Sequence, residues 1–263
     1  MKPLTVTLIQ TALHWQNPAA NRQHLEALMA DVPAGCLVLL PEMFATGFTM
    51  QPAQWAEPME GPTVQWLAQQ AVQKRVAIAG SLPISEADKY YNRLIMMLPN
   101  GQYLYYNKRH LFAFAGEDAH YTPGSNRLIA SLNGWRLNMQ VCYDLRFPVW
   151  ARQSPGLEQP EYDVLMYVAN WPERRSHAWR TLLQARAIEN QCYVMGVNRI
   201  GPDGQGITHR GDSMIVDPLG EIVWEAPPYQ EAVFTYTLPF ATLQEVRTKL
   251  PFLKDADNFR LLA

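Results

Sequence analysis

Cysteine is scarce in this sequence, and the motifs that usually hold metals are missing. The 263 residues include three cysteines, Cys36, Cys142 and Cys192. An odd, small number of cysteines in a chain of this length does not indicate a disulfide framework. There is no CxxC pair and no HExxH motif, and the six histidines are scattered, so we expect no metal site. This cysteine usage is typical of a reducing compartment, and we expect the protein in the cytoplasm.

Long apolar runs and an excess of one charge are absent as well. No stretch approaches the roughly 18 apolar residues that a membrane span requires. The start MKPLTVTLIQTAL is short, is interrupted by Thr and Gln, and lacks a small-residue cleavage site, so it predicts a strand rather than a signal peptide. The formal net charge is −2, from 22 basic and 24 acidic residues, with no long run of like charge. We therefore expect neither a nucleic acid nor a membrane as a partner.

No linker, low-complexity tract or repeat divides the chain, and strand and helix patterns alternate to its end. Runs typical of strands lie at residues 4–10, 36–40, 76–79, 164–168, 193–198 and 233–238. Helical patterns lie at 21–29, 63–75, 177–190 and 241–249. Hairpin signals occur at Pro99-Asn100-Gly101, Asn133-Gly134 and Pro218-Leu219-Gly220. We expect residues 1–263 to form a single α/β domain in which helices cover mixed sheets.

Cys142 lies where a predicted strand ends. The apolar pattern stops at Val141, and a polar Tyr-Asp-Leu-Arg segment follows the cysteine. A nucleophile at such a turn exposes its sulfur, and the backbone N–H groups that follow can face a developing oxyanion. A buried cysteine also commonly behaves as a small hydrophobic residue, so the residues alone leave both interpretations open. Cys36 and Cys192 lie inside apolar runs, which favours the core for both.

Two charged residues have similarly divided interpretations. Glu42 follows the apolar run 36–40 and Pro41, at the carboxyl end of a predicted strand, where ligands bind in open α/β sheets. A turn residue in a loop is the simpler interpretation. Lys108 lies in a Lys-Arg-His run after the strand pattern 103–106, and a solvated basic cluster is its simpler interpretation.

Three segments resemble the signature segments of the nitrilase, or carbon–nitrogen hydrolase, superfamily. They are LLPEMF at 39–44, YNKRHLF at 106–112 and VCYDLRFP at 141–148, in the family's order. YVANWP at 167–172, ARAIEN at 185–190 and GDS at 211–213 extend the resemblance over nearly the whole chain. The likeness is strongest to the omega-amidase branch, which hydrolyses the terminal amide of 2-oxoglutaramate and 2-oxosuccinamate. The resemblance implies an α-β-β-α sandwich whose sheets pair across a homodimer or a higher homo-oligomer.

The resemblance also implies the catalytic roles. Glu42 would be the general base, Lys108 the cationic stabiliser and Cys142 the nucleophile, while Glu117 matches a second glutamate that orients the site. Such a trio suits an amide, because its poorly electrophilic carbonyl needs a thiolate and its nitrogen needs a proton to leave. The Lys108 ammonium and the Tyr143 backbone N–H are the expected oxyanion donors. No metal or organic cofactor is required by this chemistry.

A small oxo-acid amide carries a carboxylate remote from the bond that breaks, so its pocket needs a cation or several donors. Arginine suits carboxylates, and three arginines lie near the motif segments. Two further residues are candidate donors, and three aromatic residues are candidate apolar walls, although each has an ordinary structural interpretation as a loop, ion-pair or core residue. The arginines are Arg146, Arg174 and Arg175, the further donors are Tyr143 and Asn170, and the aromatic residues are Phe44, Phe48 and Trp171.

Alternative functions remain open at this level. Within the superfamily, the alternative is another small-amide or N-carbamoyl hydrolase. A catalytically silent binding or scaffold module on the same fold is the alternative from a different class, and the intact glutamate, lysine and cysteine weigh against it. A thiol redox sensor has less support, because no resolving cysteine is evident near Cys142.

Overall fold

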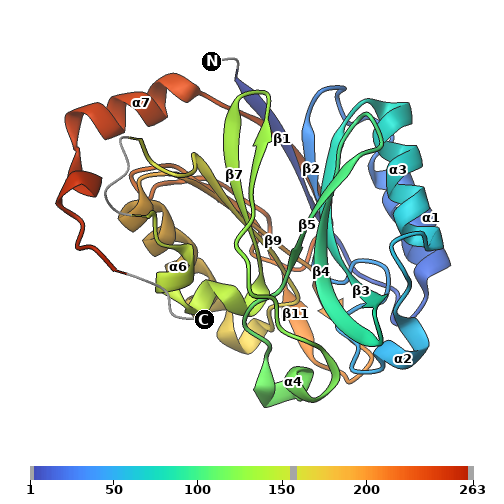
Figure 1. Ribbon diagram of the computed structural model, residues 1–263. Helices are drawn as coiled ribbons and strands as arrows, with labels where there is room; N and C mark the ends of the chain where they lie inside the picture. The colour runs from blue at the N-terminus through green and yellow to red at the C-terminus, as the bar shows by residue number, and fades with distance from the viewer. Residues whose placement is uncertain (1–2, 155–158, 260–263) are drawn as a thin grey trace.

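Two six-stranded sheets pack face to face, and helices cover their outer faces (Figure 1). The computed structural model describes residues 3–154 and 159–259. The first sheet has the order β14-β1-β2-β3-β4-β5 and the second has the order β13-β12-β9-β8-β7-β6. Helices α1 and α3 lie outside the first sheet, and α6 and α7 lie on the side of the second sheet (Figure 1). The predicted α-β-β-α architecture is therefore confirmed, whereas pairing of the sheets across a dimer stays a prediction.

The bounds of the elements follow. The first sheet contains β1 (Leu4–Gln10), β2 (Leu37–Leu39), β3 (Ala77–Glu86), β4 (Lys89–Met97), β5 (Tyr103–Asn107) and β14 (Ala232–Leu238). The second contains β6 (Ile129–Leu132), β7 (Trp135–Val141), β8 (Val164–Ala169), β9 (Tyr193–Asn198), β12 (Met214–Val216) and β13 (Ile222–Glu225). The hairpin of β10 (Ile200–Pro202) and β11 (Thr208–Arg210) stands apart.

The longer helices are α1 (Pro18–Leu28), α3 (Pro62–Lys74), α6 (Ser176–Asn190) and α7 (Phe240–Lys249). Single-turn helices are α2 (Pro52–Trp55), α4 (Glu117–His120) and α5 (Pro148–Ala151). Short 3-10 turns occur at η1 (Ala113–Ala115), η2 (Cys142–Arg146), η3 (Glu173–Arg175) and η4 (Phe252–Asp255). Among the described residues, no helix is long and apolar enough to cross a membrane.

Strand β2 shows why the buried strands are continuously apolar. Successive side chains of a strand point to opposite faces. Leu37 and Leu39 pack in the core between the two sheets, and Val38 packs in the second core under α1 and α3. Both faces are buried, so no polar residue interrupts the run.

Most predicted elements exist, with shifted ends. The Asn133-Gly134 signal forms a two-residue loop between β6 and β7, and both residues have the positive φ values that such a turn requires, 53° and 88°. Helix α1 begins at Pro18, earlier than the predicted residue 21, because Pro18 fits the first turn and Asn17 caps it by accepting from the Ala20 N–H. The predicted strand 76–79 runs on to Glu86, since residues 78–86 pair with β4. The β10–β11 hairpin was not predicted.

The topology gathers loop segments at one end of the sandwich. Strands β1, β2 and β3 are parallel, as are β7, β8 and β9. The carboxyl ends of β2, β7 and β8 therefore carry Glu42, Cys142 and Asn170. Strand β5 delivers Lys108 to the same place, near the end where α4 lies (Figure 1).

Candidate active site

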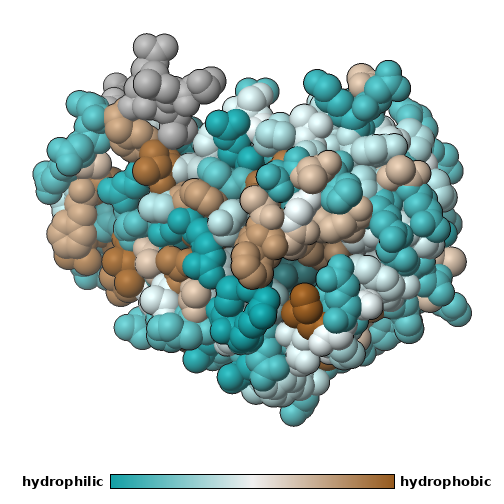
Figure 2. Space-filling view, turned by 90° about the horizontal axis from the view of Figure 1, so that it is seen from below, coloured by the Kyte–Doolittle hydropathy of each residue, from teal (hydrophilic) through white to brown (hydrophobic). Residues whose placement is uncertain are grey.

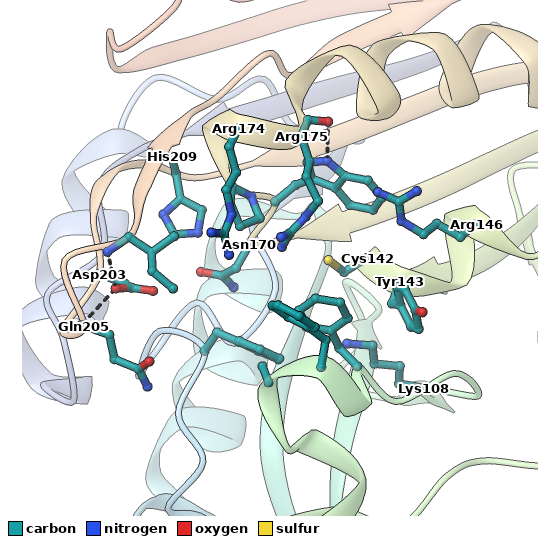
Figure 3. Close-up of a pocket in the computed structure, with 17 residues that line it drawn as sticks. Lys108, Cys142, Tyr143, Arg146, Asn170, Arg174, Arg175, Asp203, Gln205 and His209 are labelled. Atoms are coloured by element: carbon teal, nitrogen blue, oxygen red, sulfur yellow. Dashed lines mark hydrogen bonds between the residues drawn. The ribbon is translucent and has the colours of Figure 1, made fainter.

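Cys142 occupies a strained turn directly after β7. It opens η2 with φ +43°, a left-handed conformation that non-glycine residues rarely adopt. Strain of this kind persists only where surrounding contacts hold it, and it gathers at functional sites. The Asp144 carboxylate supplies one such contact by accepting from the Val141 N–H at 3.0 Å. The sulfur points into the space between Lys108 and Arg175 (Figure 3).

A buried cluster of two carboxylates and one amine lies behind the thiol. The Lys108 Nζ donates to Glu42 Oε1 at 2.9 Å and to Glu117 Oε1 and Oε2 at 3.0 and 2.8 Å. The Asn92 Nδ2 donates to Glu42 Oε1 and Glu117 Oε1 at 2.8 and 3.0 Å. All four residues are at most 1% exposed. The solvated interpretation of Lys108 is therefore wrong.

Backbone groups from distant segments complete the cluster. The Asn170 N–H donates to Glu42 Oε2 at 2.8 Å, and the Asn170 side-chain amide donates to the Glu42 carbonyl at 2.6 Å. These bonds connect the ends of β2 and β8, one from each sheet. The Phe112 N–H donates to Glu117 Oε2 at 2.6 Å. Glu42 and Glu117 are thus held in place by donors, as buried carboxylates must be.

Burial and charge set the protonation of this cluster. Burial raises the pKa of the Cys142 thiol well above its usual value, Glu42 raises it further, and Lys108 offsets part of the increase. For Lys108, burial lowers the pKa, but the charges of Glu117, Glu42 and Cys142 outweigh this and raise it overall. Burial also raises the pKa of Glu117, against the opposing effect of Lys108. The lysine is therefore an ammonium, and the thiol keeps its proton near neutral pH.

A cavity of about 210 Å³ opens over the thiol. Figure 2 shows this end of the molecule, with a hollow near its centre bordered by hydrophilic and hydrophobic residues. Seven of the eight predicted substrate-pocket residues line the cavity: Phe48, Tyr143, Arg146, Asn170, Trp171, Arg174 and Arg175. Lys108 and Cys142 also line it, while Glu42 and Glu117 lie behind them, with no exposed surface.

The three arginines of the cavity have no acidic partner in the part of the chain that the structure describes. Arg146 lies over the Trp171 ring, with its Cζ 4.9 Å from the centroid, and Arg175 lies over Phe112 at 5.1 Å. The pKa of Arg175 is lowered by burial and by its neighbours Arg174 and Arg146. An anion bound among them would relieve this repulsion.

One expected wall residue lies elsewhere, and several lining residues were missed. Phe44 packs in the core, with its ring 6.2 Å from Trp66, so its assignment to the pocket is wrong. Phe112 and Phe114 line the cavity, and the first of them lies inside the YNKRHLF segment. The β10–β11 hairpin adds residues for which the sequence shows no signal: Asp203, Gln205, Ile207 and His209. Burial and the charge of Arg199 lower the pKa of His209 to about 4, so this imidazole is neutral at neutral pH.

Comparison with known proteins gives a family match over most of the chain. The Carbon-nitrogen hydrolase family model matches residues 5–248. The chain is 44% identical to Omega-amidase YafV of Yersinia enterocolitica over 100% of both chains. It is 31% identical to the 2-oxoglutaramate amidase of Bacillus subtilis, covering 95% of this chain and 96% of that one.

A solved structure shows the same fold. XC1258 from Xanthomonas campestris, a CN-hydrolase superfamily protein with an arsenic adduct in its active site, matches with a TM-score of 0.96 and 43% identity over 99% of this chain and 100% of that one. Because the family model spans most of the chain and relatives match it along their full length, this protein belongs to the carbon–nitrogen hydrolase family.

Proposed function

We propose that this protein is an omega-amidase that hydrolyses the terminal amide of small 2-oxo-acid amides, 2-oxoglutaramate and 2-oxosuccinamate, to the 2-oxo acid and ammonia. The observation that carries the proposal is the Cys142 thiol, which opens into a cavity beside an ammonium bracketed by two buried carboxylates. Relatives named omega-amidase and 2-oxoglutaramate amidase support the choice of substrate.

The first step is activation of the thiol. Glu42 accepts the proton from Cys142, and the sulfur attacks the amide carbon. The transfer occurs within the cluster, so the total buried charge is unchanged. The raised pKa of the Cys142 thiol opposes loss of its proton to solvent, but a transfer to Glu42 keeps the proton inside the cluster. Lys108 lies close enough to favour the anionic sulfur.

The tetrahedral oxyanion then needs donors. The Lys108 ammonium is one, and the Tyr143 backbone N–H is the other, because Tyr143 lies in the first turn of η2, where N–H groups have no intrahelical acceptor. A single donor of this kind typically lowers the barrier by roughly 3–4 kcal/mol. Glu117 positions Lys108 through two hydrogen bonds without touching the reacting atoms.

Departure of ammonia and hydrolysis complete the cycle. Glu42 returns its proton to the amide nitrogen, the C–N bond breaks, ammonia leaves, and a thioester remains on Cys142. Glu42 then takes a proton from water as the water attacks the thioester carbon. The C–S bond breaks, the thiol recovers the proton, and the 2-oxo acid is released.

The carboxylate remote from the scissile amide fits the arginine-lined part of the cavity. Arg146, Arg174 and Arg175 all line it, and Arg175 is the one that we propose as the principal contact. It is half-buried, the charge of Cys142 raises its pKa, and its guanidinium lies over the Phe112 ring. Phe48 and Trp171 supply apolar walls for the short chain of the substrate.

Ammonia release tests the proposal. Wild type and Cys142→Ala are assayed with 2-oxoglutaramate, succinamate, glutamine and a carbamoyl amino acid. We expect the highest kcat/KM for 2-oxoglutaramate and complete loss in the variant. Preference for the carbamoyl compound would instead assign the protein to another branch of the superfamily. Equal background release from both proteins would favour a silent binding module.

Three properties of the whole protein belong to the same proposal. Residues 1–263 act as one catalytic domain, which the family match over 5–248 supports. The protein forms a homodimer, which light scattering of the purified protein tests. It works in the cytoplasm, where a reducing environment keeps the nucleophile free; the structure has Cys36, Cys142 and Cys192 as free thiols. Cell fractionation followed by the amidase assay tests the location.

A further inference from the structure

Asp144 joins the two loops that carry the proposed nucleophile and the lysine. Its Oδ2 accepts from the Val141 N–H at 3.0 Å and from the Tyr106 hydroxyl at 2.8 Å. Its Oδ1 accepts from the His110 N–H at 2.9 Å and lies 2.7 Å from His110 Nδ1. Val141 precedes Cys142, whereas Tyr106 and His110 stand two residues before and after Lys108.

Tyr106 extends the connection. Its hydroxyl donates to Asp144, and the hydroxyl oxygen accepts from the Arg109 N–H at 3.1 Å and from the Trp150 Nε1–H at 2.9 Å. Trp150 belongs to α5, which follows the nucleophile turn. Through Asp144 and Tyr106, the loop that carries Lys108 is therefore bonded to Val141, just before Cys142, and to Trp150, after the turn. Tyr106 is 2% exposed, and Asp144 is 0% exposed.

A buried carboxylate is costly unless donors surround it. Asp144 has no lysine or arginine within ion-pair distance in the described ranges, and His110 is its one ion-pair partner there. Its charge is matched instead by backbone and side-chain donors from the two loops. The bond to Val141 also lies next to the strained backbone of Cys142, whose φ of +43° needs external support.

We propose that Asp144, assisted by Tyr106, is a positioning residue that fixes the Cys142 turn against the Lys108 loop and so sets the geometry of attack. It touches neither the reacting atoms nor the substrate cavity. The proposal rests on the proposed amidase chemistry for its kinetic part. It predicts a loss in kcat rather than in KM, because the binding walls are left intact.

The test compares Asp144→Asn with a matched control, Asp163→Asn. Asp163 is also 0% exposed and accepts four hydrogen bonds, from Arg136 and Arg247, far from the thiol in the fold. An asparagine at 144 keeps one acceptor oxygen, but its NH2 group must face either the Val141 and Tyr106 donors or the His110 donors, and those hydrogen bonds are lost. We expect kcat with 2-oxoglutaramate to fall about ten- to hundredfold, with KM within threefold, as for a small misplacement of reacting groups. The control should lose thermal stability but keep kcat per folded molecule within twofold.

Alkylation of Cys142 by iodoacetamide gives a second readout that does not depend on the substrate. Peptide mapping separates Cys142 from the buried Cys36 and Cys192. We expect the alkylation rate to fall with Asp144→Asn and to be unchanged with Asp163→Asn. If 2-oxoglutaramate is the wrong substrate, the amidase proposal fails while the alkylation result still stands.

A milder variant covers the case in which Asp144→Asn does not fold. Tyr106→Phe removes only the hydroxyl, and we expect a three- to tenfold loss of both kcat and alkylation rate. Values of Asp144→Asn or Tyr106→Phe within 1.5-fold of wild type would overturn the proposal. So would an equal loss of kcat in the Asp163→Asn control.

Discussion

Changing Glu117 to glutamine removes one charge from the buried cluster while keeping the size of the side chain. Its Oε1 accepts from Lys108 and Asn92, and its Oε2 accepts from Lys108 and the Phe112 N–H. A glutamine can place its oxygen at only one of these positions. At the other position its amide meets two donors, so two hydrogen bonds are lost in either orientation.

The magnitude follows from burial. Lys108 and Glu117 are at most 1% exposed, and removing one partner of a buried ion pair typically costs about 3–5 kcal/mol. Each kcal/mol corresponds to roughly 2–4 °C for a chain of about this size, so the melting temperature should fall by about 6–20 °C. Removing this charge also favours the Cys142 thiolate. We expect the misplacement of Lys108 to outweigh this gain, and kcat to fall about a hundredfold, as is typical when a reacting group is displaced.

Thermal unfolding and saturating ammonia-release kinetics measure the two effects. Glu245→Gln is the matched control: Glu245 is solvent-exposed, and within the described residues its one ion-pair partner is Lys249, on the surface of α7. Such a pair contributes little, so its removal should leave both properties essentially at wild-type values. A Glu117→Gln enzyme that melts within 2 °C of wild type and keeps kcat within threefold would refute the account of the cluster.

Three further predictions concern pH, substrate binding and the hairpin. Burial raises the pKa of Cys142 above its value in the unfolded chain, so the thiol of the unfolded chain ionises first as the pH rises. The contribution of this thiol to the free energy of unfolding is therefore complete below about pH 8.5 and falls above it. Chemical denaturation at a series of pH values should show a shallower decline of that free energy in Cys142→Ala than in wild type. Arg175→Met removes the cation that we propose binds the substrate carboxylate, so KM for 2-oxoglutaramate should rise at least tenfold while kcat stays within threefold of wild type. Succinamide, an amide without a carboxylate, is the control substrate, and its KM should not change. Gly204→Ala should raise KM and lower the melting temperature, because a Cβ there would lie 2.3 Å from the Trp15 indole and must displace the β10–β11 turn; unchanged kinetics would exclude the hairpin from substrate binding.

Patterns of neighbouring residues predicted the strands and turns whose formation depends on those residues alone. The strand pattern of β2 follows from burial on both faces, and the Asn133-Gly134 loop follows from the positive φ values that these residues tolerate. The three signature segments, through family resemblance, located the glutamate, the lysine and the cysteine. Their chemical roles stay predictions until the variants are measured.

Partners that come from distant segments were beyond reach of these patterns. No sequence pattern singled out Asn92, yet its amide bridges Glu42 and Glu117. Asp144 reads as a turn residue, yet it joins two loops. The Asn92 bonds, and the Asp144 bonds to Tyr106 and His110, join residues 25 to 50 positions apart, so spacing along the chain carries no trace of them.

Phe44 and Phe48 show the division most clearly. Both are aromatic residues close to Glu42, and composition or periodicity gives no ground to separate them. The sequence by itself determined that an apolar strand ends in this segment, and through family resemblance it predicted that Glu42, Lys108 and Cys142 act in one reaction. Only the tertiary structure decided that Phe44 packs in the core while Phe48 faces the cavity, and that the β10–β11 hairpin lines it. The physical reason is that hydrophobic patterning reports whether a side chain is buried, whereas a pocket is made by the packing of segments that the chain brings together from far apart.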